Sequence, residues 1–196
     1  MPSQGPSLPG TAASVFSDPF VGTVVWANFD NIKTHNDATE ASADMGAGAV
    51  PTDIYARLVL SATLVGNDKS TNTDLDSVTT DRVYGGPSDL WGRAWTRADI
   101  NDATFGFDFC VYNSFSLAYS EHLRATNFGF TIPVGGTIVG IQVDVGQRHA
   151  GFGFASVDHV RITVTYQIAA GDDEVAIACQ TVEGIRGRRR QASIPY

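Results

Sequence analysis

The chain has 196 residues, of which 43% are hydrophobic and 17% are charged, and its formal net charge is −8. This length and hydrophobic content suit one domain with a sizeable core. The acidic balance argues against nucleic acid as a specific partner, because phosphate binding needs a basic face. No run of about 18 apolar residues occurs, so we expect no membrane partner either.

The two ends of the chain differ in composition from its centre. Residues 1–19 are rich in Pro, Ser and Gly, show no periodicity and lack the features of a signal peptide, which predicts an extended arm. Residues 183–196 predict a second, basic arm, which either stays solvated or contacts an acidic neighbour or nucleic acid through its four arginines: Arg186, Arg188, Arg189 and Arg190. The predicted domain therefore covers residues 20–182.

The first half of this domain contains three predicted strands. Residues 22–28 form an apolar run that predicts the first strand, and residues 29–53 predict a loop. Residues 54–64 alternate between apolar and other side chains, which is the period of a half-buried strand. A long polar connection over residues 66–76 leads to a further short strand, predicted over residues 79–84.

The centre of the chain combines a helix signal with an aromatic strand. Thr96 and Asp99 have the spacing of a capping box, with Asp in place of Glu, which predicts a short helical turn after them. Residues 105–112 alternate again. This alternation places four apolar side chains on one face of a predicted strand: Phe105, Phe107, Phe109 and Val111.

The last part of the domain predicts a hairpin and two more strands. Residues 128–132 and 137–145 are strands that a Pro-Val-Gly-Gly turn joins, residues 160–168 alternate most clearly, and residues 174–182 predict one more strand. So many one-faced strands with almost no helix are best buried in two packed sheets. We therefore predict an all-β, antiparallel two-sheet β-sandwich of jelly-roll type, with extended N- and C-terminal arms.

The sequence lacks the spacings of the common catalytic and metal-binding motifs, including HExxH, GxSxG, the Walker loop and CxxC. We therefore predict no catalytic residue, no metal, no cofactor and no enzyme activity. Cys110 and Cys179 are expected to be buried free thiols, although a disulfide between them stays open. Four residues of the polar connection have oxygen ligands suited to Ca²⁺, but their spacing fits no EF-hand: Asn67, Asp68, Asp74 and Asp76.

Three aromatic residues are candidates for an interface or for stacking on a ligand: Trp91, Trp95 and Phe152. A tryptophan near a loop can stack on a sugar ring or anchor a subunit contact. It can equally close one end of a sandwich core. Burial in the core or in a subunit interface is the interpretation that we favour for the two tryptophans.

Four blocks of the sequence resemble, in combination, a group of phage-encoded β-sandwich proteins. Residues 22–28 (GTVVWAN) are similar to the opening strand of that group, and residues 84–101 (YGGPSDLWGRAWTRADIN) to a block with two tryptophans. Residues 123–141 (LRATNFGFTIPVGGTIVGI) are similar to its central hairpin, and residues 157–166 (VDHVRITVTY) to its closing strand. The resemblance covers roughly residues 20–168.

The resemblance implies a structural protein of a tailed bacteriophage, located in the virion and assembled in the host cytoplasm. It is compatible with capsid decoration or cement and with a tail, neck or baseplate component, whose partners are other virion proteins. Exposed sheet edges invite association with a neighbouring chain or its arm. We therefore expect a homo-oligomer, with a trimer favoured over a dimer.

Two other functions remain open at this point. A glycan-binding module of a tail fibre would present exposed aromatic rings beside a polar groove to a host-surface glycan. A hydrolase on a jelly-roll scaffold would need two carboxylates facing each other in a cleft, and the sequence displays no such pair.

Overall fold

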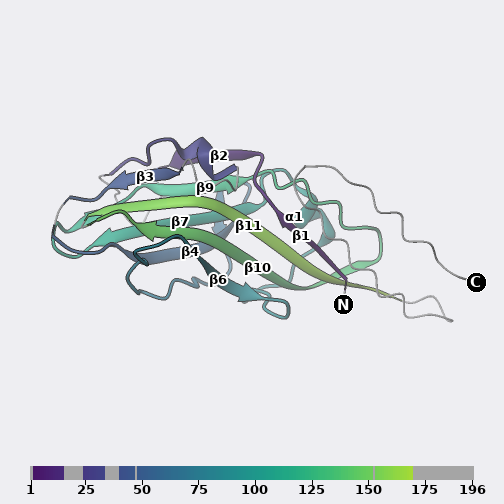
Figure 1. The fold of residues 1–196 in the computed structure, drawn as a ribbon. Coiled ribbons are helices and arrows are strands. Elements are labelled where there is room, and N and C mark those ends of the chain that lie inside the picture. The colour runs from purple at the N-terminus through teal and green to yellow at the C-terminus, as the bar shows by residue number, and fades with distance from the viewer. Residues whose placement is uncertain (1, 16–23, 34–39, 47, 152, 170–196) are drawn as a thin grey trace, which may run out of the picture.

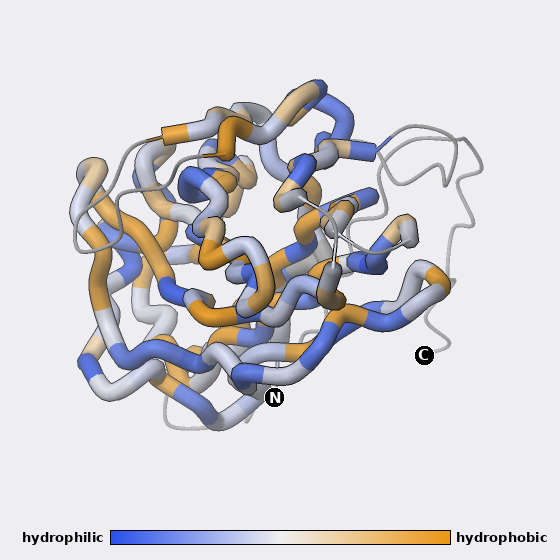
Figure 2. The backbone as a smooth tube through the Cα atoms, turned by 90° about the vertical axis from the view of Figure 1, so that its left-hand side faces the viewer, coloured by the Kyte–Doolittle hydropathy of each residue, from blue (hydrophilic) through white to orange (hydrophobic). Residues whose placement is uncertain are grey.

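The computed structural model describes residues 2–15, 24–33, 40–46, 48–151 and 153–169. Two antiparallel sheets lie face to face, which confirms the predicted all-β sandwich (Figure 1). Along the strands, hydrophobic and hydrophilic residues alternate, as expected for sheets with one buried face (Figure 2). None of the helices in the described ranges is long and apolar enough to cross a membrane.

The first sheet is built around a long hairpin. Its strands, in spatial order, are β1 (Ser3–Ser7), β11 (Phe154–Ile168), β10 (Gly136–His149) and β6 (Thr80–Gly86), and β3 (Ala41–Asp44) also pairs with β11. The pairing of β10 with β11 runs from Gly136 and Ile168 to His149 and Ala155. At about 3.4 Å per residue these two strands span roughly 50 Å, and they set the long axis of the molecule.

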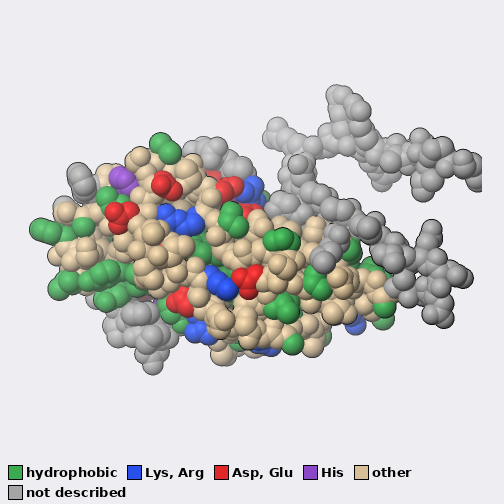
Figure 3. Space-filling view, turned by 90° about the horizontal axis from the view of Figure 1, so that it is seen from below, with side chains coloured by type: hydrophobic (Ala, Val, Ile, Leu, Met, Phe, Trp, Pro, Cys, Tyr) green, Lys and Arg blue, Asp and Glu red, His purple; other side chains and the backbone are tan. Residues whose placement is uncertain are grey.

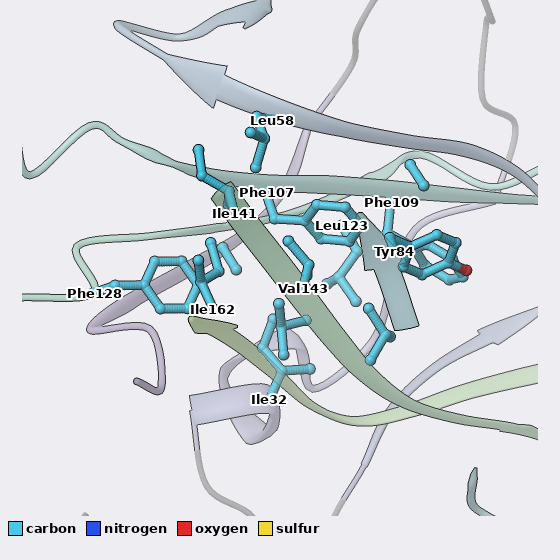
Figure 4. Packing of buried hydrophobic residues seen from close by; sticks show 14 of the residues in the cluster. Ile32, Leu58, Tyr84, Phe107, Phe109, Leu123, Phe128, Ile141, Val143 and Ile162 are labelled. Atoms are coloured by element: carbon cyan, nitrogen blue, oxygen red, sulfur yellow. The ribbon is translucent and has the colours of Figure 1, made fainter. Parts of the chain in front are cut away.

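The second sheet supplies most of the aromatic core. Its strands, in spatial order, are β2 (Thr11–Val15), β9 (His122–Thr126), β7 (Gly106–Asn113), β4 (Thr52–Leu60) and β5 (Thr63–Val65), and β8 (Ala118–Tyr119) pairs with β7. The predicted inward face of β7 is confirmed, because Phe107, Phe109 and Val111 belong to the hydrophobic core, whereas the intervening Asp108 and Cys110 are buried outside it. Phe107 and Phe109 share this core with Val143 and Ile162 of the opposite sheet (Figure 4).

Two short helices close parts of the sandwich. The 3₁₀-helix η1 (Phe29–Lys33) places Ile32 in the core, and α1 (Arg97–Asn101) places Ile100 there. The predicted capping box of α1 is confirmed: the backbone N–H of Asp99 donates to Thr96 Oγ1 at 3.1 Å, and the Thr96 N–H donates to Asp99 Oδ2 at 2.9 Å.

The N-terminal segment differs from the predicted free arm over residues 2–15. Here β1 pairs with β11 and β2 pairs with β9, so this segment contributes one outer strand to each sheet. The prolines did not prevent pairing. Pro2 precedes β1 and its carbonyl accepts from Tyr166 N at 2.9 Å, and Pro6 lies where the register with β11 shifts between Gln4 and Ser7. Residues 16–19, the predicted strand over residues 174–182 and the whole arm over residues 183–196 lie outside the described residues.

Two predicted strand boundaries also change. The run over residues 54–64 is divided into β4 and β5 by a tight turn, in which Ser61 and Ala62 have positive φ values of 50° and 63°. Positive φ at both central residues is the geometry of a two-residue hairpin, and it is unusual without Gly or Asn. The predicted first strand makes only isolated bridges in its described part, at Val24 with Ser120 and at Ala27 with Ser42.

The predicted hairpin of residues 128–132 and 137–145 is wrong. Residues 128–132 form no strand, and β10 pairs with β11 and β6 instead. The alternating apolar pattern is nevertheless real, because Phe128, Phe130 and Ile132 are buried against the end of the core. Apolar residues at every second position can therefore also occur in a loop that covers the core and turns these residues inward.

Candidate functional site

The two tryptophans singled out in the sequence lie in the core. Trp91 is fully buried, and its indole N–H donates to the Ile141 carbonyl at 2.9 Å. Trp95 is 6% exposed, and its indole N–H donates to the Leu90 carbonyl at 2.9 Å. Buried ring faces cannot stack on a sugar, so this role is wrong for both residues, whereas the core interpretation is confirmed. Phe152 and the four arginines of residues 186–190 lie outside the described residues.

These tryptophans belong to an aromatic cluster that closes one end of the sandwich, which we call the capped end. Trp95 meets Phe105 edge to face at 5.5 Å, and Phe105 meets Phe130 in the same way at 6.0 Å. Helix α1 lies over this end (Figure 1). Such edge-to-face pairs add to the free energy gained from burial.

A buried carboxylate holds the long polar connection of residues 66–76. Asp53 in β4 is fully buried and accepts hydrogen bonds from the backbone N–H groups of Thr71 and Thr73, each at 2.9 Å. It also accepts from Arg82 at 3.0 Å and from the Tyr84 hydroxyl at 3.0 Å. Burial, followed by the nearby charge of Asp53, raises the pKa of Tyr84 far above its usual range. With its lone pairs occupied in this way, Asp53 acts as a structural anchor rather than as a base.

The candidate calcium residues of this connection bind other protein groups where their contacts are known. Asp68 Oδ1 accepts from the Ala56 and Ser70 N–H groups at 3.1 and 2.9 Å. Asp76 Oδ2 accepts from Thr80 Oγ1 at 2.6 Å. Among the described residues no group of three or more His, Cys, Asp or Glu side chains is arranged to hold a metal ion.

A second buried polar cluster lies on the outer face of the sheet that contains β7 and β9. Asp108 accepts from Arg124 Nε at 2.8 Å and contacts Nδ1 of the fully buried His122. Tyr55 meets the His122 ring edge to face at 5.1 Å. An aspartate beside a histidine can orient a general base, but base catalysis requires access to a substrate. Because both side chains are fully buried, the cluster ties β7 to β9 instead.

Cys110 lies on the same strand as Asp108 and is a buried free thiol, as predicted. Its Sγ donates to the Ser120 carbonyl at 3.2 Å. Burial raises the pKa of the Cys110 thiol to about 12, so the thiolate required for nucleophilic attack is absent near neutral pH. Cys179 lies outside the described residues.

A third cluster crosses three strands of the other sheet. His159 of β11 is buried, with Nδ1 at 2.6 Å from Asp158 Oδ2 and Nε2 at 3.0 Å from Asp81 Oδ1 on β6. Strand β10 lies between them, and a Cβ at Gly146 would overlap the imidazole ring. Glycine at position 146 therefore lets the histidine reach across its neighbouring strand. Sequence analysis could not find this contact, since nothing local in the sequence connects His159 to Asp81.

The end of the sandwich opposite the capped end has a different surface. Three segments meet there, residues 45–51, 113–119 and 149–154, of which 47 and 152 are outside the described part; we call them the tip. Backbone hydrogen bonds join the segments, with Met45 N donating to Gly153 O at 2.6 Å and Gly153 N donating to Ala49 O at 3.1 Å. Asn113 Nδ2 donates to Gly46 O at 2.8 Å. Figure 2 views the molecule from this end.

Large apolar side chains are exposed at the tip. Phe115 is 72% exposed, Leu117 is 69% exposed and Phe154 is 43% exposed, and Val25 beside β8 is 60% exposed. Figure 3 shows hydrophobic side chains gathered at this end of the molecule. None of the residues in the three tip segments is Asp, Glu, Lys or Arg. An uncharged apolar surface on an acidic protein is suited to contact with another apolar surface.

Comparison of the chain with family models, curated proteins and solved structures finds no match. The fold class therefore rests on the structure itself, and the function on the geometry of its surfaces.

Proposed function

We propose that this chain is a structural protein of a bacteriophage particle, exposed on the particle surface and acting through contacts between subunits. The observation that carries the proposal is the tip, where Phe115, Leu117 and Phe154 are exposed on hydrogen-bonded, uncharged segments. Exposed apolar patches of this kind mark protein-protein contacts. The resemblance of residues 20–168 to phage β-sandwich proteins is the reason for proposing that this contact forms in a phage particle.

The rest of the described molecule supports a mechanical role. Several of its buried ionisable side chains form ion pairs that tie strands together, as at Asp53 with Arg82 and at Asp108 with Arg124. The β10–β11 hairpin runs through the whole length of the sandwich (Figure 1). A stiff body with its adhesive surface at one end is suited to capsid decoration or cement, and equally to a tail, neck or baseplate part.

The glycan-binding alternative has less support. Two of its three candidate aromatic residues, Trp91 and Trp95, are buried at the opposite end from the tip. We therefore keep host-surface glycan binding as an outcome of the test rather than as a second proposal.

The test is antibody-gold labelling of intact particles of the phage that encodes the chain, together with mass spectrometry of purified particles. Label over the head supports decoration or cement, and label on the tail supports a tail, neck or baseplate part. Label confined to the distal fibres, with binding of the isolated chain to host-surface glycan, favours the alternative. Absence of the chain from purified particles in both measurements overturns the proposal.

A further inference from the structure

Specific contacts between its segments fix the conformation of the tip. Gly48 has a φ of +124°, which L-amino acids with a side chain rarely adopt, and a Cβ there would overlap the Phe115 ring. The ring therefore lies directly against the backbone of a neighbouring segment. The Ser116 hydroxyl donates to the Met45 carbonyl at 2.5 Å and fixes the next residue. A surface held in this way loses little conformational entropy when it binds.

The exposed apolar area sets the scale of the contact. Together the exposed parts of Val25, Phe115, Leu117 and Phe154 amount to on the order of 400 Å², within the range of the largest apolar patch on a typical monomer. A stable interface buries about 800 Å² on each partner, with an apolar centre and a polar rim. The tip thus has the size of the centre of one such interface.

Charge restricts what can cover this surface. The chain has a net charge of −8, and the tip segments contain no Asp, Glu, Lys or Arg. An anionic lipid surface or a nucleic acid would be repelled by the body and would meet no Lys or Arg on the tip segments, since the neighbouring Arg148 is paired with Glu40. The partner must itself be uncharged and apolar, and the tip of a second copy has both properties.

End-to-end contact also minimises repulsion between the acidic bodies. The sandwich extends roughly 50 Å along β11, whereas electrostatic interactions in water are screened over about 8 Å at physiological ionic strength. Copies that meet at their tips keep most of their carboxylates far apart. Copies that meet side by side bring their acidic surfaces within the screening length.

We propose that the tip is a self-association surface, through which copies of this chain meet end to end around a symmetry axis. Each copy contributes the same surface, as in closed symmetric oligomers. The inference rests on the proposed function in one respect, because it names the subunit contact by which that function would operate. It is nevertheless testable on the isolated chain.

The experiment is sedimentation equilibrium of the full-length chain over a wide concentration range. The test variant combines Phe115→Ser with Leu117→Asn, since Asn tolerates the positive φ of 53° at position 117. The control combines Val83→Ser with Val134→Ser, which removes apolar side chains that are 52% and 82% exposed away from the tip. Urea unfolding of all three proteins verifies that each is folded.

We expect the wild type and the control to form a reversible oligomer whose mass is a small multiple of 20.9 kDa. The tip variant should remain monomeric, or dissociate at a concentration at least tenfold higher. Raising the salt concentration should not weaken wild-type association, because end-to-end contact keeps the carboxylates of two copies apart and salt does not weaken apolar contact. A monomeric wild type at every concentration overturns the inference, and so does equal dissociation of test variant and control.

Two further outcomes separate this inference from the proposed function. A wild-type monomer that floats with phosphatidylcholine vesicles, while the tip variant does not, overturns self-association in favour of a neutral lipid surface. A monomeric chain that is nevertheless present in particles leaves the virion role standing and removes the self-association. An oligomer that depends on the tip, formed by a chain that is absent from particles, supports self-association and overturns the virion role.

Discussion

Both ends of the sandwich have aromatic side chains, but the exposure of these side chains is opposite at the two ends. At the capped end Trp91, Trp95 and Phe105 lie beneath α1 and the loop of residues 128–132. At the tip Phe115 and Phe154 reach the surface. The difference shows that aromatic residues in loops do not by themselves indicate a ligand site. What distinguishes the ends is a covering segment, which the capped end has and the described part of the tip lacks.

The interiors of the two halves differ as well. The capped half relies on packed rings, with Trp91 meeting Phe107 edge to face at 6.2 Å. The half that leads to the tip contains buried polar groups, among them Asp53 and His159. Ring packing should therefore dominate the stability of the capped half, and hydrogen bonds of buried charged groups should dominate that of the tip half. Each of the following variants tests one of these two expectations.

Trp91→Ala should have the largest effect on stability. It removes a fully buried indole and its hydrogen bond to the Ile141 carbonyl, and it leaves a cavity. We expect the free energy of unfolding to fall by about 3–5 kcal/mol. The matched variant Phe115→Ala at the tip should change it by no more than about 0.5 kcal/mol, because the ring is mostly exposed.

Urea unfolding followed by far-UV circular dichroism measures both variants. The contrast between the two ends is wrong if Phe115→Ala lowers the free energy of unfolding as much as Trp91→Ala does. Such a result would mean that the tip aromatics stabilise the monomer and are not held ready for a partner.

Asp53→Asn should rank second, with a loss of about 3 kcal/mol. The amide cannot accept all the hydrogen bonds from Thr71, Thr73 and Tyr84, and Arg82 loses its counter-charge. Asp30→Asn is the control, because the exposed pair of Asp30 with Lys33 should contribute less than about 1 kcal/mol. Chemical denaturation of both variants measures the free energy of unfolding. An equal loss of this free energy in the two variants would contradict a structural role for Asp53.

The sequence predicted the fold where local pattern and burial agree. The alternation of Phe107, Phe109 and Val111, and of Val160, Ile162 and Val164, identified β7 and β11 because period two is set by the strand itself. The capping box at Thr96 is likewise a local signal. Pairing between strands is not local, so the partner of β10 was assigned to residues 128–132 instead of to β11 and β6.

The candidate site was harder to predict for the same reason. Residues 45–51, 113–119 and 149–154 are each uncharged, which is visible in the sequence, but only the fold brings them together. The contact of His159 with Asp81 joins residues far apart in the chain. Gly146 in the middle of an apolar strand was the one local indication that another group comes close at this position.

A smaller, pH-dependent effect is expected near the tip, where Glu40 and Arg148 form two hydrogen bonds of 2.7 Å. The Arg148 side chain is the main cause that lowers the pKa of Glu40. A carboxylate with a depressed pKa in the folded state stabilises the protein above its unfolded-state pKa, and this contribution is lost as the pH falls through the folded-state pKa. Glu40→Gln should therefore cost on the order of 1 kcal/mol at pH 7 and nothing at strongly acidic pH.

Urea midpoints of the wild type and Glu40→Gln between pH 7 and pH 2.5 measure this difference. Arg148→Met should show the same pH profile, because it removes the same pair from the other side. A difference between wild type and Glu40→Gln that does not shrink with falling pH would assign the effect to packing rather than to charge.

The smallest expected change tests whether the polar groups of the tip half are all needed. Gln147 is fully buried, and in the described part of the chain its amide makes no hydrogen bond of standard geometry, only a weaker polar contact with the Tyr84 side chain. Burial of a weakly paired amide is unfavourable, so Gln147→Met, of similar length, should leave stability unchanged or raise it by up to about 1 kcal/mol. Gln142→Met on the same strand should lower it by about 1 kcal/mol, since Gln142 Nε2 donates to Asp144 at 2.8 Å. Opposite signs in urea denaturation would separate a tolerated polar group from a stabilising one within β10, whereas a loss above about 1 kcal/mol for Gln147→Met would show that this amide, too, belongs to the network that supports the tip.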